Sequence, residues 1–119
     1  MKAATAGPRV RDHFTRSAAS VAATYAAILA AARALGPVSE DPKKTSIHLN
    51  RRTAFAGVAT QKSALVLTLK SDREVKSRRV KRSQQTSPRR WHLEVRLDAP
   101  EQVDRELRGW IARAYALAE

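Results

Sequence analysis

The spacing of apolar residues changes twice along this chain, and this change limits the folds that the chain can adopt. Apolar side chains recur at helical spacing over residues 21–35, alternate with polar ones over much of residues 46–97, and return to helical spacing over residues 103–118. A period near 3.6 is typical of a helix with one apolar face, whereas alternation is typical of a half-buried strand. The sequence therefore predicts an α+β domain whose antiparallel sheet follows one helix and precedes another.

Start and stop signals mark both predicted helices. Gly36 and Pro37 end the first helix, because glycine accepts the conformation that follows the last turn and proline cannot continue the helix. This helix is expected to begin near Arg16 or Ser17. Pro100 suits a first helical turn and opens the second helix. Each helix has one apolar stripe, so we expect both to pack on the same face of the sheet.

Alternation predicts four strands and indicates a fifth. Residues 46–50, 65–69 and 91–97 alternate clearly, Thr53–Ala59 is joined to the first two by short turns, and residues 78–86 would add a strand around Val80. Short connections favour antiparallel pairing, so we expect an antiparallel sheet of four to five strands. The face turned away from the helices would carry Ser46, His48, Thr68, His92, Glu94 and Arg96.

The length of 119 residues fits one domain, which we expect over residues 13–119. Residues 1–12 show no apolar period and are expected to form a flexible N-terminal arm. The chain has no cysteine, which excludes disulfides and cysteine-ligated zinc. It also has no apolar run of the ~20 residues that span a bilayer and no signal-peptide pattern. We therefore expect a cytoplasmic protein without membrane contact.

Positive charge is concentrated in the predicted sheet region. The chain has 23 Lys and Arg against 11 Asp and Glu, a net charge of +12, and residues 42–96 hold fifteen basic and three acidic residues. Lysine and arginine neutralise phosphates whatever the base sequence, so our first hypothesis is a binding module for nucleic acid or another polyanion. The competing interpretation is a solvated surface that keeps sheet edges from aggregating. The candidate contact residues are Lys43, Lys44, Arg51, Arg52, Arg78, Arg79, Lys81, Arg82, Arg89 and Arg90.

An alternative hypothesis places a small anionic ligand on the open sheet face. Alternation puts Ser46, His48, His92 and Arg96 on that face, and the two imidazoles would meet if their strands were close. Two imidazoles and a carboxylate could hold a metal, but no third ligand has recognisable spacing, so we expect no metal and no cofactor. No catalytic constellation is recognisable, so the domain is not expected to be an enzyme. A protein–protein adaptor is the third alternative.

The larger aromatic residues are interpreted as core. Phe55 and Trp91 lie on predicted strands, where exposed rings could stack on nucleic-acid bases, but Trp91 is in phase with the apolar residues of its strand. Trp110 lies on the apolar stripe of the second helix. We expect all three rings to be buried.

Two sequence blocks resemble a known family. Residues 43–49 read Lys-Lys-Thr-Ser-Ile-His-Leu, and residues 91–97 read Trp-His-Leu-Glu-Val-Arg-Leu. In these blocks the chain resembles a family of small bacterial domains of unknown function, some longer relatives of which are labelled predicted transport proteins. The resemblance extends from about His13 to Ala118 and implies a stand-alone domain. It carries over no catalytic or binding residues.

Overall fold

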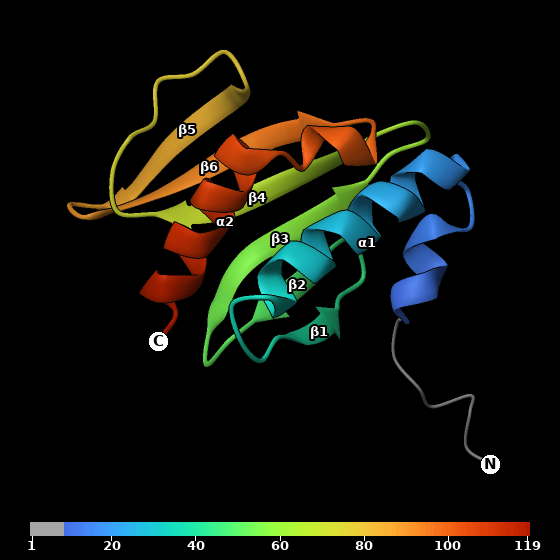
Figure 1. The fold of residues 1–119 in the computed structure, drawn as a ribbon, viewed down its shortest axis with the longest axis horizontal. Helices are drawn as coiled ribbons and strands as arrows, with labels where there is room; N and C mark the ends of the chain where they lie inside the picture. Colours follow the sequence, from blue (N-terminus) through green and yellow to red (C-terminus); the bar gives the residue numbers. More distant parts are fainter. Residues whose placement is uncertain (1–8) are drawn as a thin grey trace.

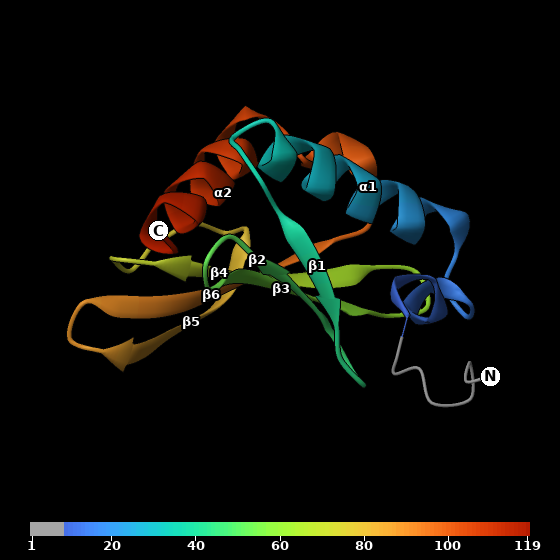
Figure 2. The same cartoon turned by 90° about the horizontal axis from the view of Figure 1, so that it is seen from below.

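A computed structural model describes residues 9–119 and contains two α-helices and a six-stranded antiparallel sheet (Figure 1). Both α-helices lie on the same side of the sheet (Figure 2), which confirms the predicted α+β architecture. The helices are η2 (Val10–Phe14), α1 (Ala19–Arg33), η3 (Pro100–Gln102) and α2 (Arg105–Leu117), of which η2 and η3 are 3-10 helices. The strands are β1 (Ser39–Pro42), β2 (Ile47–Asn50), β3 (Ala54–Thr60), β4 (Leu65–Ser71), β5 (Val80–Ser87) and β6 (Arg90–Leu97).

The order of strands across the sheet is β1-β2-β3-β4-β6-β5, so β6 lies between β4 and β5. Leu67 of β4 is opposite Val95 of β6, and Val95 is also opposite Val80 of β5. The connection over residues 72–79 therefore has to pass β6 to reach the edge position of β5. Within residues 9–119, this placement leaves β5 with one neighbouring strand and one free edge.

The sheet has one strand more than the four to five predicted. The additional strand is β1, whose sequence Ser-Glu-Asp-Pro has no alternating apolar residues. It is held by pairing with β2 and by a 2.6 Å hydrogen bond from the hydroxyl of Tyr25 in α1 to Glu40. Pro42 is tolerated because β1 is an edge strand. Burial of Tyr25 and its bond to Glu40 raise the pKa of this tyrosine.

The core lies between the helices and the sheet. Ile28 of α1 and Leu107 of α2 are fully buried, as is Leu67 of β4. Phe55 of β3 is buried as predicted and packs edge-on against Tyr115 of α2, with ring centres 5.3 Å apart. The contact ties the C-terminal helix to the central strands.

The two tryptophans are less buried than predicted. Trp110 packs against the core but is only half-buried, and the Arg79 guanidinium lies 5.8 Å from the centre of its ring. Trp91 lies on the helix side of β6, opposite Ser71 of β4 and Gln85 of β5, and is also half-buried. Its position near the β5–β6 turn takes it to the margin of the core.

The N-terminal part of the structure differs from expectation in detail. Of the segment 1–12 expected to be a flexible arm, residues 1–8 lie outside the described residues, and η2 begins at Val10. His13 is held by its ring Nε2, 2.9 Å from the carbonyl oxygen of Lys43. The first α-helix begins at Ala19, later than predicted, because the Ser17 hydroxyl donates to the carbonyl of Gln61 and does not cap the helix.

Candidate ligand-binding site

The side of the sheet away from the helices carries continuous rows of small and polar residues. One row runs from His48 of β2 through Gly57 of β3 and Thr68 of β4 to Glu94 of β6. The next contains Lys70 of β4 and His92 of β6, which are directly opposite each other. Because alternate residues point to opposite faces, these side chains share the face that Figure 2 shows uncovered by the helices.

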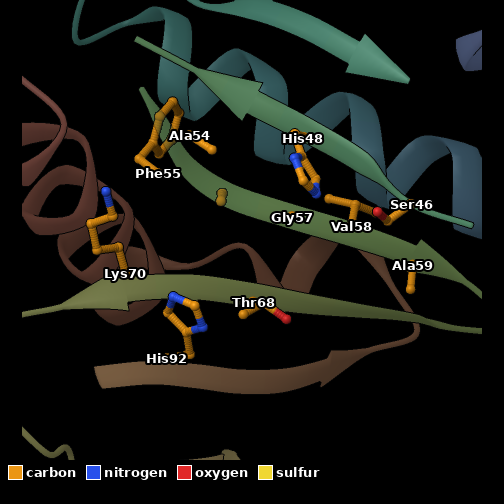
Figure 3. Close-up of a pocket in the computed structure, with 11 residues that line it drawn as sticks. Ser46, His48, Ala54, Phe55, Gly57, Val58, Ala59, Thr68, Lys70 and His92 are labelled. Carbon is orange, nitrogen blue, oxygen red and sulfur yellow. The ribbon is translucent and has the colours of Figure 1, made fainter. Parts of the chain in front are cut away.

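A hollow of about 310 Å³ lies in the middle of this open face. Its floor is a run of mostly small and apolar residues of β3, from Ala54 to Ala59. Polar side chains surround the floor, and Figure 3 shows the His48 and His92 rings on opposite sides of it. The polar residues that line the hollow are Ser46, His48, Thr68, Lys70 and His92.

Gly57 shapes the side of the hollow next to His48. A Cβ atom at Gly57 would lie 3.7 Å from the Cδ2 atom of His48, so the imidazole lies close above the glycine backbone. A larger side chain at this position would fill the space beside the ring. The glycine thus leaves the floor of the hollow open.

The two histidines do not lie close together, so the condition for binding one metal ion between them is not met. β3 and β4 separate their strands, and three interstrand spacings amount to about 14 Å. The carboxylate of Glu94 lies beside Arg82, with an N–O distance of 3.8 Å. Within residues 9–119, no three histidine, aspartate or glutamate side chains come together in a group that could hold a metal ion.

Arg96 shares the open face but does not line the hollow. It is in the row of Val66, its neighbour on β4, and its Nη1 lies 3.8 Å from the Asp98 carboxylate. Of the four residues predicted for a ligand on this face, the hollow therefore brings together Ser46, His48 and His92.

Lys70 is a residue of this hollow that the sequence interpretation missed. It follows Leu69 in the alternating stretch of β4, so its position on the open face could have been read from the sequence. Gly57 was also missed, although a glycine inside a strand often marks a close approach of another group. Neither signal could show that both residues border the same hollow as His92.

The basic residues predicted to contact a polyanion do not form one patch. Lys43 and Lys44 lie in the turn between β1 and β2, whereas Arg51 and Arg52 lie in the turn at the other end of β2. The others lie toward the opposite edge of the sheet: Arg78, Arg79, Lys81 and Arg82 at or just before the start of β5, and Arg89 and Arg90 at the β5–β6 turn.

Some of these basic side chains form ion pairs with acidic neighbours. Lys43 Nζ is 2.9 Å from Asp41, and Arg82 is the residue that contacts Glu94. Exposed members of the set without an acidic partner within residues 9–119 are Lys44, Arg51, Arg52, Arg78, Lys81 and Arg89.

Two arginines of the set stabilise the fold through specific contacts. The Arg51 guanidinium lies 4.4 Å from the centre of the Tyr115 ring and donates to the Tyr115 carbonyl at 3.2 Å. Arg79, whose side chain is 26% exposed, donates to Asp104 at 2.8 Å and to Glu106 at 3.1 Å. The hydrogen bond from Arg79 lowers the pKa of Asp104 and raises the pKa of Arg79. Arg79 is therefore bound within the domain.

Comparison with family models places the chain in a family. The model of the family described as Domain of unknown function (DUF5655) matches residues 10–118. No curated protein and no solved structure matches the chain. No helix within residues 9–119 is long and apolar enough to cross a bilayer.

Proposed function

Because the chain belongs to the DUF5655 family, which has no assigned function, its activity has to be argued from its own residues, and we propose that it binds a small anion with a flat apolar body. The site is the hollow on the open sheet face. The observation that carries this proposal is an apolar floor bordered on two sides by His48, Lys70 and His92. The proposal makes the domain a binding module and gives it no catalytic step.

The charge of the lining supports an anionic ligand. No lining residue of the hollow, all of which lie within residues 9–119, is acidic, whereas Lys70 supplies an ammonium group. Thr68 adds a hydroxyl, and each imidazole can donate through a ring N–H. Hydrogen bonds from charged donors to an anion are about twice as strong as neutral ones.

The floor supports a flat apolar body on the ligand. Ala54, Gly57 and Ala59 have little or no side chain, so a planar group could approach the strand closely. The volume of about 310 Å³ is at the lower end of the range for small-molecule sites, about 300 to 1,000 Å³. A ligand of one ring system with one acidic group fits this space.

Adenosine 5′-monophosphate is a suitable probe because it joins a flat ring to a phosphate. We expect it to shift the amide NMR signals of Gly57, Thr68 and His92, whereas adenosine and inorganic phosphate, each with one half of the chemistry, produce smaller shifts at equal concentration. Saturable shifts at these residues support the proposal. If none of the three compounds moves these signals, the proposal is wrong.

A pair of matched variants localises the binding. Thr68→Glu puts a carboxylate into the hollow, and Thr86→Glu makes the same charge change at an exposed position on β5. We expect about tenfold weaker binding of the probe to Thr68→Glu, since charged hydrogen bonds contribute about 1.5–3 kcal/mol, and little change for Thr86→Glu. Equal loss in both variants would indicate a general charge effect and contradict a site in the hollow.

Polyanion contact is a second candidate function, supported by the exposed basic residues that have no acidic partner in the part of the chain that the structure describes. Lys81 and Arg89 are such residues on the β5–β6 hairpin, and Arg78 lies just before it. A nucleic acid could follow this edge by phosphate contacts alone, because Phe55 is buried and Trp91 lies on the helix side. The two candidates differ in location: polyanion binding should respond to charge changes on the hairpin, and small-ligand binding to changes in the hollow.

A further inference from the structure

We propose that the domain has a second ligand site, on the helix side of the sheet, for an organic anion with an apolar body. The site is a hollow of about 350 Å³ between α2, the end of β4 and the connection over residues 72–79. It is separate from the hollow on the open face, and only Lys70, at the end of β4, borders both. The proposal therefore does not depend on the function proposed above.

Apolar side chains from three elements form the inner wall of this second hollow. Leu93 comes from β6, Val75 from the connection over residues 72–79, and Trp110 from α2. Trp110 is half-buried, so part of its ring is available to a ligand. These three side chains provide an apolar contact surface with an aromatic ring in it.

Basic side chains form the rim. Arg105 and Arg113 come from α2, and Lys70 and Arg73 from the end of β4 and the connection that follows. Glu106 is the single acidic residue of the lining within the described chain, and Arg79 already pairs with it at 3.1 Å.

Asp72, in the connection that borders this rim, is close to two of its arginines. It lies 3.2 Å from Arg73 and 3.9 Å from Arg113, so it offsets part of their charge. Arg105 has no acidic partner within residues 9–119. The rim therefore keeps an excess of positive charge, which favours an anionic group on the ligand.

Gly109 is the residue whose identity favours a ligand in this hollow. It lies in the middle of α2, where glycine destabilises a helix relative to alanine. A Cβ atom at this position would have no atom within 4 Å, so packing within the domain does not require glycine. Arg105, Gly109 and Arg113 follow one another at four-residue spacing and so lie along one side of the helix. The glycine keeps the space between the two arginines open.

The test uses two aromatic anions with the same ring, 1-naphthyl phosphate and 1-naphthoate, and uncharged 1-naphthol as the control. The readout is the indole N–H NMR signal of Trp110, assigned with a Trp91→Phe variant. We expect at least one anion to shift this signal saturably and to bind about tenfold or more tightly than 1-naphthol, because the arginines contact the charge. The preferred anion distinguishes a phosphate ligand from a carboxylate.

Variants then locate the site. Gly109→Leu should fill the space between the arginines and weaken binding about tenfold or more, with the helical circular dichroism retained. Arg105→Gln combined with Arg113→Gln should weaken the binding of the anions and leave the binding of 1-naphthol unchanged. This pair tests the proposal even if Gly109→Leu does not fold. Arg11→Gln combined with Arg16→Gln makes the same charge change far from α2 and should have no effect.

Three results would overturn the proposal: no shift of the Trp110 signal with either anion, equal affinity for 1-naphthol, or equal loss in the control pair. The Thr68→Glu variant distinguishes this site from the hollow on the open face. It should leave the Trp110 response intact, and if it abolishes that response, the anion binds on the open face and the second site is wrong.

Discussion

Arg79 Nη1 donates to both carboxylate oxygens of Asp104, at 2.8 and 3.0 Å. Asp104 at the same time caps α2, because its carboxylate accepts a hydrogen bond from the Leu107 amide at 3.1 Å. Arg79 also donates to the carbonyl of Gln102 at 2.7 Å, and its guanidinium lies 5.8 Å from the centre of the Trp110 ring. The arginine thereby fastens the connection before β5 to the start of the C-terminal helix.

The Arg79 contacts predict a measurable loss of stability on truncation. We expect Arg79→Ala to lower the free energy of unfolding by about 1–2 kcal/mol, because charged hydrogen bonds contribute more than exposed ion pairs and Arg79 is partly covered. Urea denaturation followed by circular dichroism measures the change. Arg78→Ala, one residue away and exposed, should change stability by less than about 0.5 kcal/mol. Equal effects of both variants would show that the Arg79 contacts add nothing.

Acid should weaken the same cluster. Arg79 and the Leu107 amide lower the pKa of Asp104 in the folded protein below its ordinary value of about 3.9. The stabilisation is thus present above about pH 4 and is lost as the pH falls through the lower pKa of the folded state.

Asp104→Asn tests this pH dependence, because asparagine can still cap the helix but carries no charge. We expect its free energy of unfolding to fall less steeply below about pH 4 than that of the unchanged protein. Asp72, whose pKa is lowered by Arg73, should leave part of the acid response in place. An unchanged acid response in Asp104→Asn would contradict the assignment.

Two glycines should respond to alanine in opposite directions. Gly36 has a φ of 155°, and a Cβ atom there would collide with the hydroxyl of Tyr115, which donates to the Pro37 carbonyl. We expect Gly36→Ala to lower the free energy of unfolding by about 2 kcal/mol or more. Gly109→Ala should raise the free energy of unfolding by about 0.5–1 kcal/mol, because alanine stabilises a helix relative to glycine and its Cβ atom would displace no other atom. Thermal unfolding of both variants checks the pair, and a loss of stability in Gly109→Ala would show an unrecognised constraint in α2.

Polyanion binding should depend steeply on the salt concentration. For ~4 phosphates neutralised on a DNA duplex, a plot of log K against log salt should have a slope of about −3 to −4. Lys81→Glu combined with Arg89→Glu should make the slope shallower. Arg11→Glu combined with Arg16→Glu is the control with the same net charge. Fluorescence anisotropy with a labelled duplex measures both, and no binding at low salt removes the polyanion hypothesis.

Local periodicity was sufficient to predict most of the fold. The Leu65, Leu67 and Leu69 alternation predicted β4 with its buried face, because burial of one face of a strand requires a period of two. β1 was missed, since Glu40 and Asp41 carry no such pattern and the strand depends on pairing with β2 and on the bond from Tyr25. Contacts with β2 and α1, and not a pattern of its own residues, hold this strand in place.

The candidate sites were predictable only in part, for a related reason. Alternation correctly put His48 and His92 on one face, but their separation depends on the strand order, which places β3 and β4 between them. The hollow beside α2 was not predicted, because Val75, Leu93 and Trp110 come from three separate elements. Gly109 was a visible signal, since a glycine in the middle of a helix has a cost that something must offset.

The insertion of β6 between β4 and β5 also determines the order in which the chain can assemble. β1, β2 and β3 each pair with the next strand in sequence, so the part from β1 to β4 forms through short loop closures, which are fast. β5 pairs with β6, so it has no strand partner until β6 has formed. β6 must in turn pair with β4. We therefore expect the β5–β6 hairpin to be the last part of the sheet to fold, and its amide hydrogens to be the first of the sheet to exchange with solvent.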